Sequence, residues 1–242
     1  MSLKEYTAEQ FKKFGPAELD IHQDVAQLTA DLLDIYSVSG EEKRLADAVE
    51  TALTNLENLE ITRDGDSIIA RTDFGKDKRV VLAGHLDTVP LPAVEGSEGT
   101  VPSVWKEEAG ERVLFGRGAT DMKGGVAVQL ALAAHLTDSA YDITYVFYDH
   151  EEVSSELSGL GRLMRNHAEK LTDADFAVLL EPTDGTIEGG CNGTMRFWIH
   201  TQGLRAHSGR AWKGKNAIHQ LADILTRLST YESQTYDVEG LA

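Results

Sequence analysis

The sequence predicts an α/β protein, in which a mostly parallel sheet is flanked by helices and is followed by part of a second, α+β domain. Short, continuous apolar runs, typical of strands buried on both faces, recur up to residue 180. They alternate with segments whose apolar residues recur at helical spacing. This pattern changes from Ile187, so we place a domain boundary near residue 188 and expect domains over 1–188 and 189–242.

The individual elements follow from local patterns. Helical spacing predicts helices over residues 21–36, 42–56, 124–136 and 159–169. Apolar or alternating runs predict strands over residues 59–63, 67–72, 79–84, 143–148 and 176–180. Residues 91–110 are polar and contain Pro and Gly, which predicts a long functional or mobile connection. Beyond the boundary, alternation predicts a strand over 195–201, and a helix is expected over about 216–231.

Composition excludes several classes of protein. The 242 residues carry a net charge of −17, from 40 acidic and 23 basic residues, so a nucleic-acid partner is not expected. The single cysteine, Cys191, rules out an intramolecular disulfide and fits a reducing compartment. The N-terminus lacks the apolar core of a signal peptide, and no apolar run is long enough to span a membrane. We expect a soluble cytoplasmic protein.

The first candidate site is formed by His85 and Asp87, which follow the apolar run over 79–84. Ligands of α/β proteins bind outside the carboxyl ends of the strands, where these residues lie. A metal-bound histidine usually donates its second ring N–H to an oxygen, and Asp87 could accept it. Taken alone, a His-x-Asp pair is explained more simply as a polar end to a strand.

The second candidate is a glycine-rich segment that leads directly into an apolar helix: Gly116-Arg117-Gly118-Ala119-Thr120-Asp121-Met122-Lys123-Gly124-Gly125. Its spacing matches neither the phosphate loop nor the dinucleotide-binding fingerprint. One interpretation is an anion cradle at the start of the helix. The other is that the glycines let the backbone crowd a site into which Asp121 points.

Two further groups of carboxylates follow the next apolar strands. Glu151 and Glu152 are adjacent, so they point in different directions, and one can bind metal while the other handles a proton. A solvated acidic loop is the simpler reading of such a pair alone. Glu181, in Glu181-Pro182-Thr183, adds a carboxylate in the same layer.

Considered together, these residues predict a metal site. His85, Asp121, Glu152 and Glu181 each follow or flank an apolar strand or a buried helix, so we expect them to converge, with Glu151 at the edge. Carboxylate oxygens with a histidine nitrogen and no thiolate suit Zn²⁺, Co²⁺ or Mn²⁺ in a catalytic rather than a structural site.

In this order, the motifs Gly-His-x-Asp-Thr-Val-Pro, Gly-Arg-Gly-x-x-Asp-Met-Lys-Gly-Gly, Glu-Glu and Glu-Pro-Thr resemble the dinuclear zinc metallopeptidase family. This family includes aminoacylases, acetylornithine deacetylases, carboxypeptidases and succinyl-diaminopimelate desuccinylases. Segments 189–193, 203–212 and 216–219 look most like the actinobacterial desuccinylases. The resemblance implies hydrolysis of an N-acyl amide, foremost N-succinyl-LL-2,6-diaminopimelate in lysine biosynthesis. A related acetylornithine deacetylase or metallocarboxypeptidase is the alternative.

The resemblance also implies two divalent metal ions, usually Zn²⁺, in a catalytic domain of zinc-peptidase type. His85, Asp121 and Glu181 would hold one ion, and Asp121 would bridge to the second, which Glu152 would bind. The peptide bond between Asp121 and Met122 would be cis.

Three further residues receive roles by the same resemblance. Glu151 would be the general base, and Asp87 would orient the metal-bound histidine. His207 matches a histidine of the family's lid domain that reaches across a homodimer to stabilise the oxyanion. Residues 189–242 would then form part of a lid and dimerisation domain. The remaining histidines and Cys191 are expected to have no role in the site.

The sequence departs from the family's pattern in one respect. In the family, the second metal takes a final histidine from near the end of a longer chain, and no such residue follows Ala242 here. We therefore expect a C-terminally truncated chain whose second metal site is incomplete, with poor activity by itself. A non-catalytic metal-binding fragment is the corresponding alternative, although Glu151 argues for an enzyme because a pure binder needs no base.

Overall fold

The computed structural model of the chain describes residues 8–93, 97–190, 193, 195–237 and 240. It divides into two compact units, Met1–Asp184 and Gly185–Ala242. The helices of the first unit are α1 (Ala8–Phe11), α2 (Val25–Asp34), α3 (Lys43–Thr54), α4 (Gly124–His135), α5 (Gly159–Asn166) and α6 (Ala168–Leu171), with an irregular turn η1 (Ala119–Lys123) before α4. Its strands are β1 (Glu60–Asp64), β2 (Ser67–Arg71), β3 (Arg79–His85), β4 (Val104–Glu108), β5 (Glu111–Phe115), β6 (Asp142–Tyr148) and β7 (Phe176–Leu179).

A five-stranded sheet forms the centre of the first unit, with the strand order β1-β2-β6-β3-β7. Strand β3 runs parallel to both β6 and β7, whereas β1 pairs with β2, and β2 with β6, in antiparallel fashion. The predicted α/β class is confirmed, and the sheet is mixed. Because β3, β6 and β7 are parallel, their carboxyl ends lie at the same edge, and the residues that follow them meet there.

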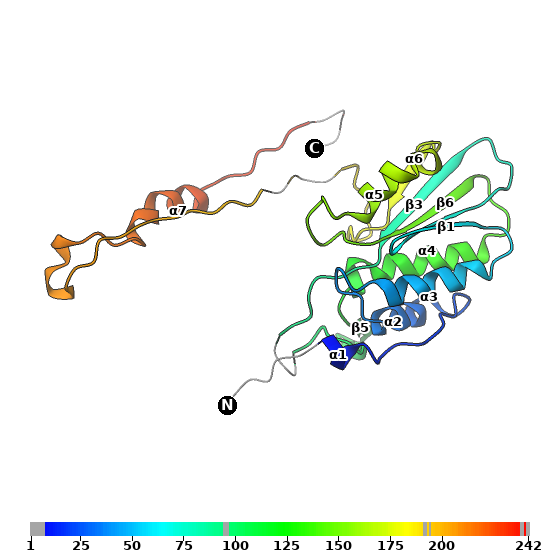
Figure 1. Cartoon of the computed structure of the whole chain (residues 1–242), viewed down its shortest axis with the longest axis horizontal. Helices are drawn as coiled ribbons and strands as arrows, with labels where there is room; N and C mark the ends of the chain where they lie inside the picture. The colour runs from blue at the N-terminus through cyan, green and yellow to red at the C-terminus, as the bar shows by residue number, and fades with distance from the viewer. Residues whose placement is uncertain (1–7, 94–96, 191–192, 194, 238–239, 241–242) are drawn as a thin grey trace. The chain divides into compact units, whose positions relative to one another are not determined.

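Helices cover both faces of the sheet (Figure 1), with α2, α3 and α4 on one side and α5 and α6 on the other. Successive side chains of a strand point to opposite faces, and the two cores follow this period. In β6, Tyr145 and Phe147 pack in the core with α2–α4, while Val146 and Tyr148 pack in the core with α5 and α6. All of β6 is buried, which explains its continuous apolar sequence.

The connection expected over residues 91–110 contains a strand, β4, that the sequence did not predict. Strand β4 pairs with β5 in an antiparallel hairpin through Glu108 and Glu111. Ala109 and Gly110 form the turn, with φ values of 52° and 84°, the sign that tight hairpin turns require. Strand β4 shows no apolar alternation, because three of its residues are charged and only the adjacent Trp105 and Lys106 are partly buried.

The second unit differs more from expectation. Residues 195–201 form no strand among the described residues, and Met195 and Trp198 are 81% and 90% exposed. Alternation shows which face a strand would bury, but a strand also needs a neighbour, and this segment pairs with none that the structure describes. The predicted helix is shorter, comprising the 3₁₀ helix η3 (His219–Leu221) and α7 (Ala222–Ser229), after a 3₁₀ helix η2 (Ser208–Lys213). Cys191 lies outside the described residues.

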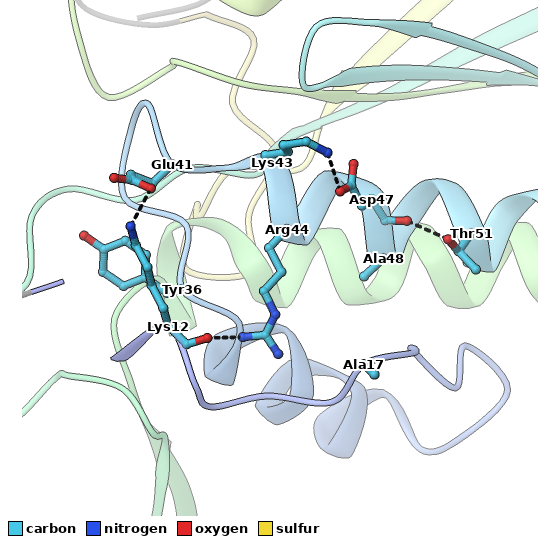
Figure 2. Close-up of a pocket in the computed structure, with 9 residues that line it drawn as sticks. All are labelled: Lys12, Ala17, Tyr36, Glu41, Lys43, Arg44, Asp47, Ala48 and Thr51. Atoms are coloured by element: carbon cyan, nitrogen blue, oxygen red, sulfur yellow. Dashed lines mark hydrogen bonds and ion pairs between the residues drawn. The ribbon is translucent and has the colours of Figure 1, made fainter. Parts of the chain in front are cut away.

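Arg44 of α3 binds the backbone of the segment that follows α1 (Figure 2). Its guanidinium donates to the backbone oxygens of Lys12, Phe14, Gly15 and Pro16. The pocket around Arg44 is lined by basic side chains that already have partners. Lys12, for example, forms ion pairs with Glu9 and Glu41. The surface therefore serves to anchor the chain. No helix in the described ranges is long and apolar enough to cross a bilayer.

Asp142, the first residue of β6, stabilises the loop that precedes β3. Its buried carboxylate accepts the backbone N–H groups of Phe74 (2.6 Å) and Lys76 (2.9 Å) and the hydroxyl of Thr72 (3.0 Å). Burial alone would raise the pKa of Asp142, but these hydrogen bonds and Arg79 outweigh it and lower the pKa. The ionised form therefore stabilises the fold above the ordinary pKa of aspartate, and this contribution is lost as pH falls through the lowered value.

We predict that Asp142→Asn lowers the free energy of unfolding by about 1–3 kcal/mol at neutral pH, since buried donors lose part of their acceptor. The difference from wild type should shrink below about pH 4, where the carboxylate of the unfolded chain is protonated. Urea denaturation at both pH values is the measurement. Asp77→Asn, at an exposed position of the same loop, is the control. An equal loss of stability at both pH values would contradict the assigned role of the ionised carboxylate.

Candidate metal centre

His85 stands at the centre of the site. It is the last residue of β3 and its side chain is fully buried. Its Nδ1 lies 2.9 Å from the backbone oxygen of Asp87, to which it can donate. Its Nε2 lies 3.0 Å from Asp121 Oδ1 and 3.9 Å from Glu181 Oε2. With the proton on Nδ1, the Nε2 lone pair faces both carboxylates, which is the arrangement of a metal-ligating histidine.

Asp121 reaches the site from η1, immediately before α4. The backbone departs from helical geometry at Asp121 and Met122, and the peptide bond between them is cis, as the family resemblance implied. Gly125 lets the start of α4 approach the end of β7, because a Cβ there would lie 2.4 Å from the backbone oxygen of Leu180. That close approach brings Asp121 near Glu181, the residue after Leu180, so the glycines serve packing around the site.

The described residues contain two groups of possible metal ligands. One comprises His85, Asp121 and Glu181, and the other comprises His85, Glu151 and Glu152. In each group, one nitrogen and two carboxylate oxygens lie within 4.8 Å of one another. This donor set, without sulfur, fits a divalent ion such as Zn²⁺ or Mn²⁺. The residues singled out in the sequence therefore do come together, and His85 belongs to both groups.

Burial and neighbouring carboxylates shift the pKa values of three groups in the site, His85, Glu152 and Glu181. Burial opposes protonation of His85, but Asp87, Glu181 and Asp121 outweigh it and raise the pKa of His85. Burial and the nearby Asp121 raise the pKa of Glu152, and burial raises the pKa of Glu181 although His85 opposes this. A divalent cation would offset the repulsion among these groups, and its binding would release protons.

Asp87 contacts the site in a different way from the expected one. Its backbone oxygen, rather than its carboxylate, accepts from His85, since Oδ1 is 3.6 Å from His85 Nδ1. The buried carboxylate instead accepts the backbone N–H of Glu151 (3.0 Å) and of Glu152 (3.1 Å). It also accepts the hydroxyl of Ser39 at 2.6 Å. Asp87 thus connects the histidine to the Glu-Glu pair.

Three polar residues around the site were missed in the sequence. Ser39 and Glu42 are two of them; Glu42, the residue before α3, makes no side-chain capping bond to that helix and is fully buried. Lys123, two residues after Asp121, is also buried and donates to the backbone oxygens of Leu32 and Ile35 (both 3.0 Å) at the end of α2. Burial lowers the pKa of Lys123 to about 7. Lys123 belongs to the glycine-rich motif of the sequence, but neither that motif nor the Ser-Gly-Glu-Glu segment shows that these polar side chains are buried.

His207 belongs to the second unit. It is exposed, and its Nδ1 accepts the backbone N–H of Gly209 at 3.1 Å, at the start of η2. Its role in a lid stays a prediction. Of the other histidines, His150 lies in the turn that carries Glu151, with its Nδ1 2.7 Å from Asp149 Oδ2.

Comparison with known proteins gives a consistent result. The model of peptidase family M20/M25/M40 matches residues 81–239. The Mycobacterium tuberculosis DapE protein, assigned as a succinyl-diaminopimelate desuccinylase, is 47% identical over 92% of this chain and 60% of its own length. The succinyl-diaminopimelate desuccinylase of Corynebacterium glutamicum is 42% identical over 92% of this chain and 59% of its own length. The chain therefore spans about 60% of the length of these two relatives.

Solved structures support the fold. A tripeptidase from Staphylococcus aureus covers 85% of this chain and 56% of its own, with a TM-score of 0.58 and 18% identity. Human carnosine dipeptidase 1 covers 66% of this chain and 39% of its own, with a TM-score of 0.50 and 25% identity. With the family model matched over more than half of the sequence, the chain belongs to peptidase family M20/M25/M40.

Proposed function

We propose that the protein is a metal-dependent amide hydrolase that converts N-succinyl-LL-2,6-diaminopimelate and water to succinate and LL-2,6-diaminopimelate. The observation that carries this proposal is that His85 belongs to two groups of possible metal ligands, one with Asp121 and Glu181 and the other with Glu151 and Glu152. The names of the relatives from M. tuberculosis and C. glutamicum support the choice of substrate.

His85, Asp121 and Glu181 would hold one ion, while Glu152, with Asp121 as a bridge, would contribute to the second. Bound divalent ions lower the pKa of a water molecule and polarise a carbonyl group. The donor set supports Zn²⁺, with Co²⁺ or Mn²⁺ as substitutes.

Glu151 would act as the general base. Its carboxylate takes a proton from water as the water oxygen bonds to the acyl carbon, and passes that proton to the amine nitrogen as the carbon–nitrogen bond breaks. Exposure of Glu151 at the edge of the site supports this role, because a base must reach water and substrate. Asp87 would fix the positions of His85 and of the Glu-Glu pair through its hydrogen bonds to them.

We also propose a role for the second unit and a cellular location for the protein. Residues 189–242 would belong to a lid and dimerisation domain, and His207 would stabilise the oxyanion across a homodimer. Exposed apolar side chains such as Trp198 and Trp212 support a role in association. The reducing compartment that suits a chain with one cysteine supports a cytoplasmic location.

Substrate preference tests the proposal. Release of succinate from N-succinyl-LL-2,6-diaminopimelate, and of acetate from N-acetylornithine, is measured with added Zn²⁺ and with a chelator. The proteins compared are this chain and a hybrid in which the part of the M. tuberculosis relative outside the matched region follows Ala242. We expect metal-dependent succinate release that is faster than acetate release in the hybrid. Faster acetate release, or hydrolysis that survives the chelator, would overturn the proposal.

A further inference from the structure

The turn that carries Glu151 and Glu152 has its backbone held by buried carboxylates from two other parts of the fold. The N–H of His150 donates to Glu42 Oε1 at 3.2 Å. The next two N–H groups, of Glu151 and Glu152, donate to Asp87 Oδ1 and Oδ2 at 3.0 and 3.1 Å. Three successive amides are thus bound by two side chains, both of which are fully buried. We call Glu42 and Asp87 the carboxylate clamp.

The turn depends on these contacts because its own backbone is unfavourable. His150 has a φ of 58°, in the left-handed region that residues other than glycine seldom adopt. Such a conformation persists only where its surroundings determine it. On the other side of the turn, Asp149 is held by Arg162 at 2.6 Å and accepts a hydrogen bond from Ser67. The position of the Glu-Glu pair is therefore set from outside the turn.

The Glu42 carboxylate also accepts backbone N–H groups of its own segment, those of Gly40 and Glu42, and His150 Nδ1 lies 3.5 Å from its Oε1. Glu42 stands immediately before α3, but it makes no side-chain capping bond to that helix. Full burial of a carboxylate is costly, and buried acidic groups persist where they satisfy specific donors. The donor from a distant part of the chain is the His150 amide, one residue before Glu151. Its partner Asp87 is itself supported by Ser39, from the same Ser-Gly-Glu-Glu segment.

We propose that Glu42 is a positioning residue of the hydrolytic site: together with Asp87 it fixes the backbone of residues 150–152, so that Glu151 and Glu152 are directed at the point His85 faces. This inference rests on the proposed function, because it assigns those glutamates to the reaction. Groups that orient metal ligands typically account for about 10–100-fold in metal affinity.

Two substitutions of Glu42 distinguish its role in positioning the turn from the effect of its negative charge. Glu42→Gln keeps the length of the side chain and an oxygen that can accept from His150, but removes the charge. Glu42→Asp keeps the charge but shortens the side chain by one methylene, so the oxygen no longer reaches the amide. Leu45→Ala is the control: Leu45 is buried in the same helix, so its loss lowers stability without touching the turn.

The test combines Co²⁺ titration of the metal-free chain with hydrogen exchange of the backbone amides of residues 150–152. For Glu42→Asp we expect about 10–100-fold weaker affinity for ions that involve Glu152, and at least tenfold faster exchange of the His150 amide. Glu42→Gln and Leu45→Ala should stay within about threefold of wild type in affinity. The proposal fails if Glu42→Asp matches wild type, or if Leu45→Ala weakens binding equally.

The same experiment separates this inference from the proposed function. If the wild-type chain binds no Co²⁺, the metal site is wrong, and the exchange rates of residues 150–152 still decide whether the clamp holds the turn. Unchanged exchange in Glu42→Asp together with tight Co²⁺ binding in wild type would overturn the clamp alone. If Glu42→Asp does not fold, weakened binding in Glu42→Gln, which keeps the acceptor, would equally overturn it.

Discussion

Replacing Glu151 with Gln should lower turnover by about 10²–10⁴-fold and leave metal affinity nearly unchanged, since a positioned base is worth about that factor. Two features of the site lead to this expectation. Glu151 is exposed at the edge, whereas the neighbouring Glu152 is half-buried. The amide oxygen of glutamine keeps the shape of the side chain and its ability to accept a hydrogen bond, but it cannot take a proton from water at neutral pH.

The measurement compares turnover and metal content of the hybrid described above, with and without the substitution. Glu156→Gln is the matched control, because Glu156 is an exposed glutamate of the same loop. It should change neither quantity. The geometry alone also allows Glu151 to be a ligand, with His85 and Glu152. Loss of a metal ion in Glu151→Gln would assign it that role, and retained turnover would place the base elsewhere.

The second large effect concerns metal occupancy of the 242-residue chain. We expect one ion to be held tightly by His85, Asp121 and Glu181, and a second ion, near Glu152, to bind at least 10–100-fold more weakly. The reason is that the second ion shares Asp121 with the first, and His85 Nε2 cannot serve both. A metal site that lacks a direct ligand should lose at least as much metal affinity as a site that lacks a residue orienting a ligand.

Metal analysis after dialysis is the measurement, and about one ion per chain is the expected result. Glu181→Gln should remove most of that ion, whereas Glu169→Gln, at an exposed position on α6, should retain it. Two tightly held ions per chain in wild type would show that residues within the chain complete both sites. Retention of the ion in Glu181→Gln would remove Glu181 from the ligand set.

Much of the site could be read from the sequence because parallel strands place their carboxyl ends together. His85, the Glu-Glu pair and Glu181 each follow an apolar run, and those runs are β3, β6 and β7 of one sheet. Strands buried on both faces are visible as uninterrupted apolar segments, since both sides of the chain meet a core. His85, the last residue of β3, which lies between β6 and β7, is buried.

Other features depend on contacts between segments far apart in the sequence. Glu42 and His150 are separated by 108 positions, and nothing local distinguishes a buried acceptor from a solvated glutamate in Ser-Gly-Glu-Glu. The route by which Asp87 contacts His85, through its backbone oxygen, is likewise set by how the chain bends after β3. The β4–β5 hairpin was not predicted because neither strand has a fully buried residue, which leaves little apolar pattern to detect.

The position of β7 has a consequence for how the chain behaves at high concentration. It is an outer strand of the sheet, pairing with β3 alone among the described strands, and Phe176 and Leu179 on it are 64% and 52% exposed. Such an edge presents open backbone donors and acceptors next to apolar side chains, and it templates pairing with extended segments of other molecules. Colloidal stability of this chain should therefore be limited by β7 despite a net charge of −17, which otherwise keeps molecules apart. A lysine in place of Phe176 should extend the concentration range in which the chain stays dispersed.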